Sequence, residues 1–273
     1  MGRAETAAVL SIAGSDSGGG AGIQADLKAF ARCGVHGMTA ITAITAQNTV
    51  GVTAIEPVSP RMIRAQVAAV AEDIGVDAVK VGMLGTRETI EAVSEALDLL
   101  GDAPVVVDPV MVAESGADLL DPGAKSALVE MIVPRATIVT PNIPEARALT
   151  GLGEETGQAE LAEAVVALGP RAVVVTGGHS DSLVDLFFDG ERHIEITGER
   201  HPGNSSHGSG CTHSSCLAAF LGRGIEPLEA ARAARMMASA AVGNGLESIG
   251  AGSGPVDVIG LAEARRMDRG PGL

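Results

Sequence analysis

Apolar and polar residues alternate along most of this chain between two patterns, one typical of strands and one of helices. Short runs rich in β-branched residues predict strands, and segments with apolar residues at helical spacing predict helices, among them residues 23–34 and 60–75. Such alternation predicts an α/β fold with a mostly parallel sheet and helices on both faces. The predicted strands are residues 7–14, 38–45, 52–58, 77–83, 104–110, 137–142 and 171–178.

Two further strand-like runs follow in quick succession, at residues 182–190 and 192–198. The short connection DGE between them predicts an antiparallel hairpin at an edge of the sheet. No long linker, charge block or fixed-period repeat divides the chain. We therefore expect one domain over residues 1–273, with three layers.

Composition and charge exclude several classes of function. The formal net charge of −15 would repel a phosphate backbone, so we expect no nucleic-acid partner. The first residues do not combine basic side chains with a following apolar run, and no apolar stretch approaches the length of a membrane span. We therefore expect no membrane partner and a cytoplasmic location. The three cysteines have no framework spacing, which favours reduced thiols. The chain has no Trp or Tyr and only three lysines, so an anionic ligand needs backbone amides, arginine or a divalent cation.

Polar clusters follow several of the predicted strands. In open α/β sheets, ligands bind at the carboxyl ends of the strands, and these clusters fall there. The clusters are GSDSGGGAG, DPVM, TPN, TGGH and HGSGC.

The segment SSHGSGCTHSSC, residues 205–216, combines glycine, cysteine and histidine. On a helix, Cys211 and His213 lie roughly 200° apart and Cys211 and Cys216 roughly 140° apart, so they do not converge on one metal. Glycines before a helix present amides that bind anions, although an ordinary glycine-rich turn has the same pattern. No lysine follows a glycine loop as in a P-loop, and a dinucleotide fingerprint is unconvincing.

Two carboxylates and an amide follow neighbouring strands and are suited to magnesium. Asp108 ends one predicted strand, and Asn142 and Glu145 follow the next. Taken alone, Asn142 and Glu145 are also typical of a helix cap with a first-turn acid. Together with an anion loop, however, the set indicates a phosphoryl transferase.

The motifs that combine these residues resemble a known family. From about residue 9 to residue 246, the chain is similar to the bacterial hydroxymethylpyrimidine/phosphomethylpyrimidine kinases of the ribokinase-like superfamily. The resemblance implies a three-layer ribokinase-like fold, ATP and Mg²⁺ as cofactors, small-molecule substrates and a homodimer. It is carried by IAGSDSGGGAGIQADLKAF, TAITAQNT, KVGML, DPVM, TPNIPEA, GGH and HGSGC.

The resemblance also implies a role for individual residues. The product would be the diphosphate of 4-amino-5-hydroxymethyl-2-methylpyrimidine, made in two phosphorylations in thiamine biosynthesis. Gly208, Ser209, Gly210 and Cys211 would form the catalytic anion loop; Gln47, Asp26, Gly20, Ala21 and Met83 would bind the pyrimidine; Asn142, Glu145, Thr176 and Gly178 would bind the nucleotide; and Asp108 and Glu145 would bind the metal.

Cys211 stands where related sugar kinases have an aspartate base. A helix N-terminus lowers the pKa of a thiol, so Cys211 is a candidate base for the hydroxymethyl group. The second acceptor, a phosphate, needs no base. This hypothesis predicts that Cys211→Ser harms the first step more than the second. A thiol that merely packs under the loop is the alternative.

Several positions depart from the family's pattern. The segment before the anion loop lacks a lysine and a threonine, Thr176 replaces a common lysine, and Glu114 stands where lysine or a neutral residue is usual. These changes remove positive charge around a polyphosphate, and arginine or a second cation would have to compensate. The alternative functions are pyridoxal or pyridoxine kinase, a sugar kinase, or a non-catalytic ligand-binding module on the same fold.

Overall fold

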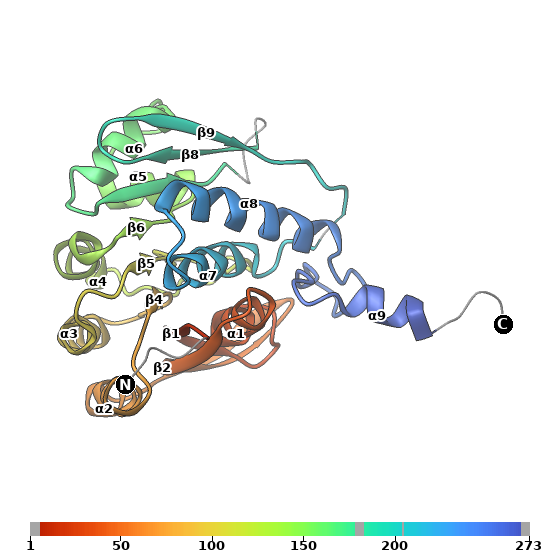
Figure 1. The fold of residues 1–273 in the computed structure, drawn as a ribbon, viewed down its shortest axis with the longest axis horizontal. Helices are drawn as coiled ribbons and strands as arrows, with labels where there is room; N and C mark the ends of the chain where they lie inside the picture. Colours follow the sequence, from red (N-terminus) through yellow and green to blue (C-terminus); the bar gives the residue numbers. More distant parts are fainter. Residues whose placement is uncertain (1–5, 178–182, 204, 269–273) are drawn as a thin grey trace.

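A nine-stranded sheet runs through the described part of this chain (Figure 1). The structure is a computed structural model, and it describes residues 6–177, 183–203 and 205–268. The strand order is β3-β2-β1-β4-β5-β6-β7-β8-β9. The strands are β1 (Ala8–Asp16), β2 (His36–Asn48), β3 (Gly51–Pro57), β4 (Ala78–Val81), β5 (Val105–Val107), β6 (Ile138–Val139), β7 (Ala172–Val175), β8 (Val184–Phe188) and β9 (His193–Thr197).

Helices connect most of the strands, and their first residues explain where several of them begin. Ser59 and Thr86 each accept a hydrogen bond from a first-turn amide of the helix that follows, and Pro60 takes the first helical position. The helices are α1 (Gly22–Arg32), α2 (Pro60–Asp73), α3 (Arg87–Leu97), α4 (Ala124–Ala127), α5 (Ile143–Thr150), α6 (Gln158–Val166), α7 (Ser209–Gly222), α8 (Pro227–Gly243) and α9 (Leu261–Asp268).

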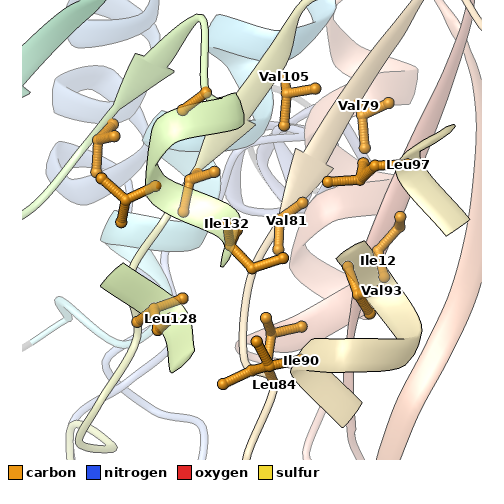
Figure 2. Close-up of a cluster of buried hydrophobic side chains, with 14 of the residues drawn as sticks. Ile12, Val79, Val81, Leu84, Ile90, Val93, Leu97, Val105, Leu128 and Ile132 are labelled. Atoms are coloured by element: carbon orange, nitrogen blue, oxygen red, sulfur yellow. The ribbon is translucent and has the colours of Figure 1, made fainter. Parts of the chain in front are cut away.

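The two faces of the sheet carry two separate hydrophobic cores. Side chains alternate along each strand, so Leu10 and Ile12 of β1 face one side while Val9 faces the other. Helices α2 to α6 cover the first face, and α1, α7 and α8 cover the second (Figure 1). Figure 2 shows part of the first core, including Ile12, Val79, Val81, Leu84, Ile90, Val93, Leu97, Val105, Leu128 and Ile132.

The structure confirms the mostly parallel sheet with helices on both faces. It also confirms the antiparallel hairpin, which is β8 and β9 at one edge. At the opposite edge, β2 and β3 pair antiparallel as a second hairpin, a pairing that the sequence analysis did not predict. A strand pattern alone does not say whether the next strand pairs antiparallel with it or crosses the sheet. The connection between β2 and β3 is too short for a crossover, so the two strands pair antiparallel.

The topology brings the functional segments to one place. Strands β1, β4, β5, β6 and β7 run parallel, so their carboxyl ends share one edge of the sheet, where α7 also begins. None of the helices in the described residues is both long and apolar enough to cross a membrane.

Candidate active site

A cavity of about 400 Å³ opens at the carboxyl ends of the parallel strands. It brings together most of the residues that the sequence analysis selected. Gly20 and Asp26 do not line it, and Gly178 lies outside the described residues. The selected residues in its walls are Ala21, Gln47, Met83, Asp108, Asn142, Glu145, Thr176, Gly208, Ser209, Gly210 and Cys211.

The predicted anion loop forms the first turn of α7. Gly208 caps the helix with a φ of 82°, a left-handed conformation that favours glycine. The Ser209 amide donates to the Ser206 carbonyl at 3.0 Å. The amides of Gly210 and Cys211 have no hydrogen-bond partner among the described residues, and a Cβ added to Gly210 would meet open space. Two free donors at a helix N-terminus therefore face the cavity, as anion binding requires.

The other glycine-rich loop, residues 16–22, is arranged differently. The carboxylate of Asp16 accepts hydrogen bonds from the amides of Gly18, Gly20 and Ala21 at 2.8 to 3.0 Å. Burial alone would raise the pKa of Asp16, but the hydrogen bonds from His207 and from these amides together lower it. The predicted pyrimidine contact through Gly20 is therefore not supported: its amide is engaged and it does not line the cavity. Ala21 lines the cavity, but its amide is engaged in the same way.

His207 joins the two loops. Its Nε2 lies 3.3 Å from Asp16 Oδ2, and both side chains are buried. A Cβ on Gly20 would overlap the ring of His207, and a Cβ on Gly208 would overlap the carbonyl oxygen of Gly20. The loops thus approach each other at backbone distance, and the Asp16–His207 pair fixes the entry to α7.

A buried lysine lies at the floor of the cavity. Lys80 of β4 is fully buried, and its Nζ lies 3.0 Å from Asp26 Oδ1 and 4.0 Å from Asp108 Oδ2. Burial alone would lower the pKa of Lys80, but the neighbouring Asp26 carboxylate raises it overall, so the ammonium stays charged. The hydroxyls of Ser11 and Ser215 also donate to Asp26 at 2.6 and 2.7 Å. The structure therefore does not support the predicted contact between Asp26 and a pyrimidine, because Asp26 is buried behind the cavity wall and holds Lys80.

The thiol of Cys211 has a different electrostatic environment from the one predicted. Burial raises its pKa to about 12, and the Asp108 and Asp26 carboxylates add to this increase, although Lys80 opposes it. The expected lowering of the Cys211 pKa is therefore not supported, because burial and the two carboxylates outweigh Lys80 and the hydrogen bond from the Gly22 backbone. All three cysteines carry free thiols, as expected.

Asn142 and Glu145 form the helix cap that the sequence analysis had weighed as one of two interpretations. Asn142 and Glu145 form a capping box for α5: the Glu145 amide donates to Asn142 Oδ1 at 2.8 Å, and the Asn142 amide donates to Glu145 Oε2 at 2.9 Å. Burial and the nearby Asp108 carboxylate raise the pKa of Glu145 to about 8. Burial also raises the pKa of Asp108, against the opposing effects of Lys80 and a hydrogen bond from Ser214.

These carboxylates fit a magnesium ion that the substrate helps to hold. In the described part of the chain, no three His, Cys, Asp or Glu side chains gather as a complete metal cage. Mg²⁺ usually takes only one or two protein carboxylates and completes its shell with water and phosphate oxygens. Asp108 and Glu145 would supply two such carboxylates, and a divalent cation would offset the burial and the Asp108 charge that raise the pKa of Glu145.

Two residues selected for pyrimidine binding, Gln47 and Met83, also line the cavity. Gln47 lines the cavity, and its Oε1 accepts a hydrogen bond from Thr45 Oγ1 at 3.0 Å. Its Nε2 has no partner among the described residues and is available as a donor. Met83 is buried with Ala43 and Leu119 and gives this part of the wall an apolar surface.

Charged residues near the anion loop include one of the positions at which the sequence departs from the family's pattern. Glu114 reaches the loop, where its Oε1 accepts a hydrogen bond from Ser206 Oγ at 2.7 Å. Arg200 and Arg235 line the same cavity, so its wall contains two arginines although lysines common in the family are missing. Thr176 is held next to Asn142, because its amide donates to the Pro141 carbonyl at 2.8 Å.

Sequence reasoning missed Lys80, Asp16 and His207 as site residues. Lys80 lies within a strand motif, and its spacing gives no sign that a carboxylate 54 residues earlier neutralises it. Asp16 and His207 are 191 residues apart in sequence. A signal for Asp16 existed, since an acid two residues before a glycine-rich turn commonly accepts hydrogen bonds from the backbone amides of that turn.

Comparison with known proteins gives a consistent result. The model of the family described as phosphomethylpyrimidine kinase matches residues 16–257. A protein of Rhizobium meliloti named hydroxymethylpyrimidine/phosphomethylpyrimidine kinase is 50% identical over 258 residues, covering 92% of this chain and 96% of the relative.

Solved structures of related kinases are similar to most of this chain. The phosphomethylpyrimidine kinase of Clostridium difficile is 41% identical, with a TM-score of 0.75 over 85% of this chain and 97% of that one. A Bacillus subtilis pyridoxal kinase, solved as an ADP complex, is 38% identical, with a TM-score of 0.86 over 94% of this chain and 99% of that one.

Proposed function

The chain belongs to the phosphomethylpyrimidine kinase family and is therefore a kinase, and on this basis we propose that it phosphorylates 4-amino-5-hydroxymethyl-2-methylpyrimidine and then its monophosphate in thiamine biosynthesis. We propose ATP as the phosphoryl donor and Mg²⁺ as the metal. The observation that carries this proposal is the pair of free amides at Gly210 and Cys211, which face the cavity beside Asp108 and Glu145.

In this proposal, the residues of the chain act mainly by positioning and by charge. Phosphoryl transfer has a loose transition state, so binding the transferred group and neutralising its charge supply most of the catalysis. The free amides would hold the transferred phosphoryl group, while the donor amide of Gln47 and the Met83 surface would orient the pyrimidine. The charged Lys80 would offset the acids at the cavity floor.

Asp108 and Glu145 would hold the magnesium ion. When bound, the metal would neutralise charge on the phosphates. Glu145 must lose its proton to bind a cation, and its pKa of about 8 makes that loss more complete as the pH rises.

A second candidate function is phosphorylation of pyridoxal. Its support is the similarity to the Bacillus subtilis pyridoxal kinase and to a pyridoxal kinase of Staphylococcus aureus solved with ADP. Gln47 favours the pyrimidine, since its free donor suits a ring nitrogen between amino and methyl substituents.

One assay separates the two candidates. Magnesium- and ATP-dependent ADP release would be compared with hydroxymethylpyrimidine, its monophosphate and pyridoxal at equal concentration. We expect turnover with both pyrimidines and little with pyridoxal. Turnover with pyridoxal alone would favour the second candidate, and no turnover with any acceptor would contradict both.

We also propose a homodimer and a cytoplasmic location, which stay predictions. The exposed apolar residues at a sheet edge lie on the β2–β3 hairpin: Ile44, Val50 and Ile55 are 55%, 60% and 39% exposed. They support a self-associating surface at the β2–β3 hairpin. Sedimentation equilibrium of the wild type and of Ile44→Glu would test the association.

A further inference from the structure

Two of the three cysteines lie together in the core between α1 and α7, away from the cavity. Cys33 directly follows the last turn of α1, and Cys216 lies in the middle of α7. Both belong to the hydrophobic core on the second face of the sheet, and neither lines the cavity. The two thiols form a side-chain hydrogen bond with each other. The chain therefore buries a pair of neighbouring thiols that the proposed phosphoryl transfer does not use.

Contacts on either side of this pair hold the two helices against each other. One residue before Cys216, the hydroxyl of Ser215 donates to Asp26 Oδ1 of α1 at 2.7 Å. At the other end of α7, Arg223 Nη1 donates to the Cys33 carbonyl at 3.1 Å. The two thiols thus lie between elements that other contacts already hold together.

The two thiols differ in their access to solvent. Cys33 is 5% exposed, whereas Cys216 is fully buried. The residues on either side of Cys33, Arg32 and Gly34, are exposed, so Cys33 lies close beneath the protein surface. A small oxidant that enters from solvent therefore meets Cys33 before it meets Cys216.

The two thiols also differ in their readiness to ionise. The hydrogen bond with Cys216 lowers the pKa of Cys33, and the guanidinium groups of Arg223 and Arg32 add to this effect against burial. The same hydrogen bond, together with burial, raises the pKa of Cys216 well above its usual range. Peroxides oxidise the thiolate form, so Cys33 is the more reactive member of the pair. The thiol of Cys211, with a pKa of about 12, is less reactive than Cys33 although it lines the cavity.

We propose that Cys33 and Cys216 form a peroxide-sensitive dithiol, which hydrogen peroxide converts into an internal disulfide between α1 and α7. The Cys33 thiolate attacks one peroxide oxygen, the O–O bond breaks and hydroxide leaves, which produces a sulfenic acid on Cys33. The Cys216 sulfur then attacks the Cys33 sulfur, and the S–S bond forms as the sulfenic hydroxyl leaves with the Cys216 proton as water. Overall, the two thiols lose two electrons, and one peroxide is reduced to two waters.

The disulfide would join two helices that each begin at a glycine-rich loop beside the cavity. Helix α1 follows residues 16–22, and α7 begins within the anion loop. Oxidation at this pair leaves the Cys211 thiol of the anion loop unchanged. The inference is independent of the proposed function, because neither cysteine lines the cavity.

The test follows the thiols of the native protein during titration with hydrogen peroxide. Catalase removes the remaining peroxide, and N-ethylmaleimide then blocks and counts the free thiols in denaturant. Trypsin cleaves after arginine, so it releases residues 33–61 and 201–223 as two peptides unless a disulfide joins them. Residues 201–223 contain both Cys211 and Cys216, so Cys211→Ser is the matched control that assigns the bond.

The wild type should lose two of its three free thiols and about 2 Da in mass, and dithiothreitol should restore both thiols. Residues 33–61 and 201–223 should be recovered as a linked pair, in Cys211→Ser as in the wild type. Cys216→Ser should stop at a sulfenic acid on Cys33, which dimedone traps. Cys33→Ser should keep both of its thiols at the same dose of peroxide.

Oxidation of Cys211 ahead of Cys33 in the wild type would overturn the proposal. Loss of thiols without the linked peptides, or a link that disappears in Cys211→Ser, would overturn it as well. Circular dichroism before the titration shows which variants are folded. The linked peptides are read in the wild-type protein, so the proposal can be decided even where a serine variant does not fold.

Discussion

Two glycine-rich loops meet at the edge of the sheet, and each leads into a helix. In residues 16–22, the carboxylate of Asp16 engages the amides that would otherwise be available to an anion. Residues 208–211 contain no such acid, and the amides of Gly210 and Cys211 have no hydrogen-bond partner in the part of the chain that the structure describes. Loops of similar composition thus differ in their free amides. In the closed loop, residues 16–22, Asp16 already accepts hydrogen bonds from the amides, and in the open loop, residues 208–211, two amides remain available to an anion.

The difference shows that glycine content and a helix start do not by themselves make a binding site. What decides is whether an acid within the loop already satisfies the free amides. The closed loop still matters, because its Gly20 carbonyl lies against Gly208 and its Asp16 holds His207. Residues 208–211 present the free amides, and residues 16–22 hold them in position.

The largest effect should come from Gly208→Ala. An alanine there has an unfavourable positive φ and overlaps the Gly20 carbonyl oxygen, so the two loops must separate. We expect kcat/KM to fall more than about 100-fold, with a clear loss of thermal stability. The control is Gly153→Ala, where a Cβ meets open space. Wild-type activity in Gly208→Ala would contradict the close approach of the loops.

Asp16→Asn tests the closed loop. Asparagine cannot replace a buried carboxylate that accepts three amides and His207, so we expect about 2 to 4 kcal/mol less stability and about tenfold lower kcat/KM. Because the pKa of Asp16 is lowered below 3.8 in the folded protein, its stabilisation is present above that pH and is lost as the pH falls through the folded pKa.

The difference in unfolding free energy between wild type and Asp16→Asn should therefore be nearly constant at neutral pH and shrink below about pH 4. Denaturant unfolding at several pH values measures it. A difference that grew toward acid pH would show that the Asp16 carboxylate is not stabilised as described.

Cys211→Ala examines whether the open loop acts through its amide or its thiol. With a pKa of about 12, the thiol stays neutral at physiological pH and is a poor base. We expect similar losses of about two- to fivefold in both phosphorylations, and slow reaction of Cys211 with iodoacetamide below about pH 10. A loss confined to the first phosphorylation would restore the base hypothesis.

The smallest effect should come from the acid beside the open loop. Glu114→Lys replaces a negative charge next to Ser206 by a positive one and should lower the KM for ATP about two- to threefold, less at high salt. The same change at Glu160, on the exposed side of α6, is the control. Equal effects at both positions would indicate a general charge effect and not a local one.

Much of this arrangement could be predicted from the sequence, and the remainder depends on long-range contacts. The strand and helix periodicities predicted the sheet and the carboxyl-end location of Asp108, Asn142 and Glu145. The charge of Lys80, the pKa of Cys211 and the roles of Asp16 and Asp26 depend on groups far apart in the chain. No local pattern contains the burial or the neighbouring carboxylates that determine them.

The most direct test of the open loop uses the amides of the three cysteines. Labelling with ¹⁵N-cysteine gives signals from Cys33, Cys211 and Cys216, and the spectrum of Cys211→Ser assigns the Cys211 signal. The amide of Cys33 donates to the Ala29 carbonyl, and Cys216 lies inside α7, so both are internal references. On saturation with magnesium and a non-hydrolysable ATP analogue, the Cys211 signal should move well beyond the other two. Saturating binding that left the Cys211 signal unmoved would contradict the assignment of residues 208–211 as the phosphoryl-binding loop.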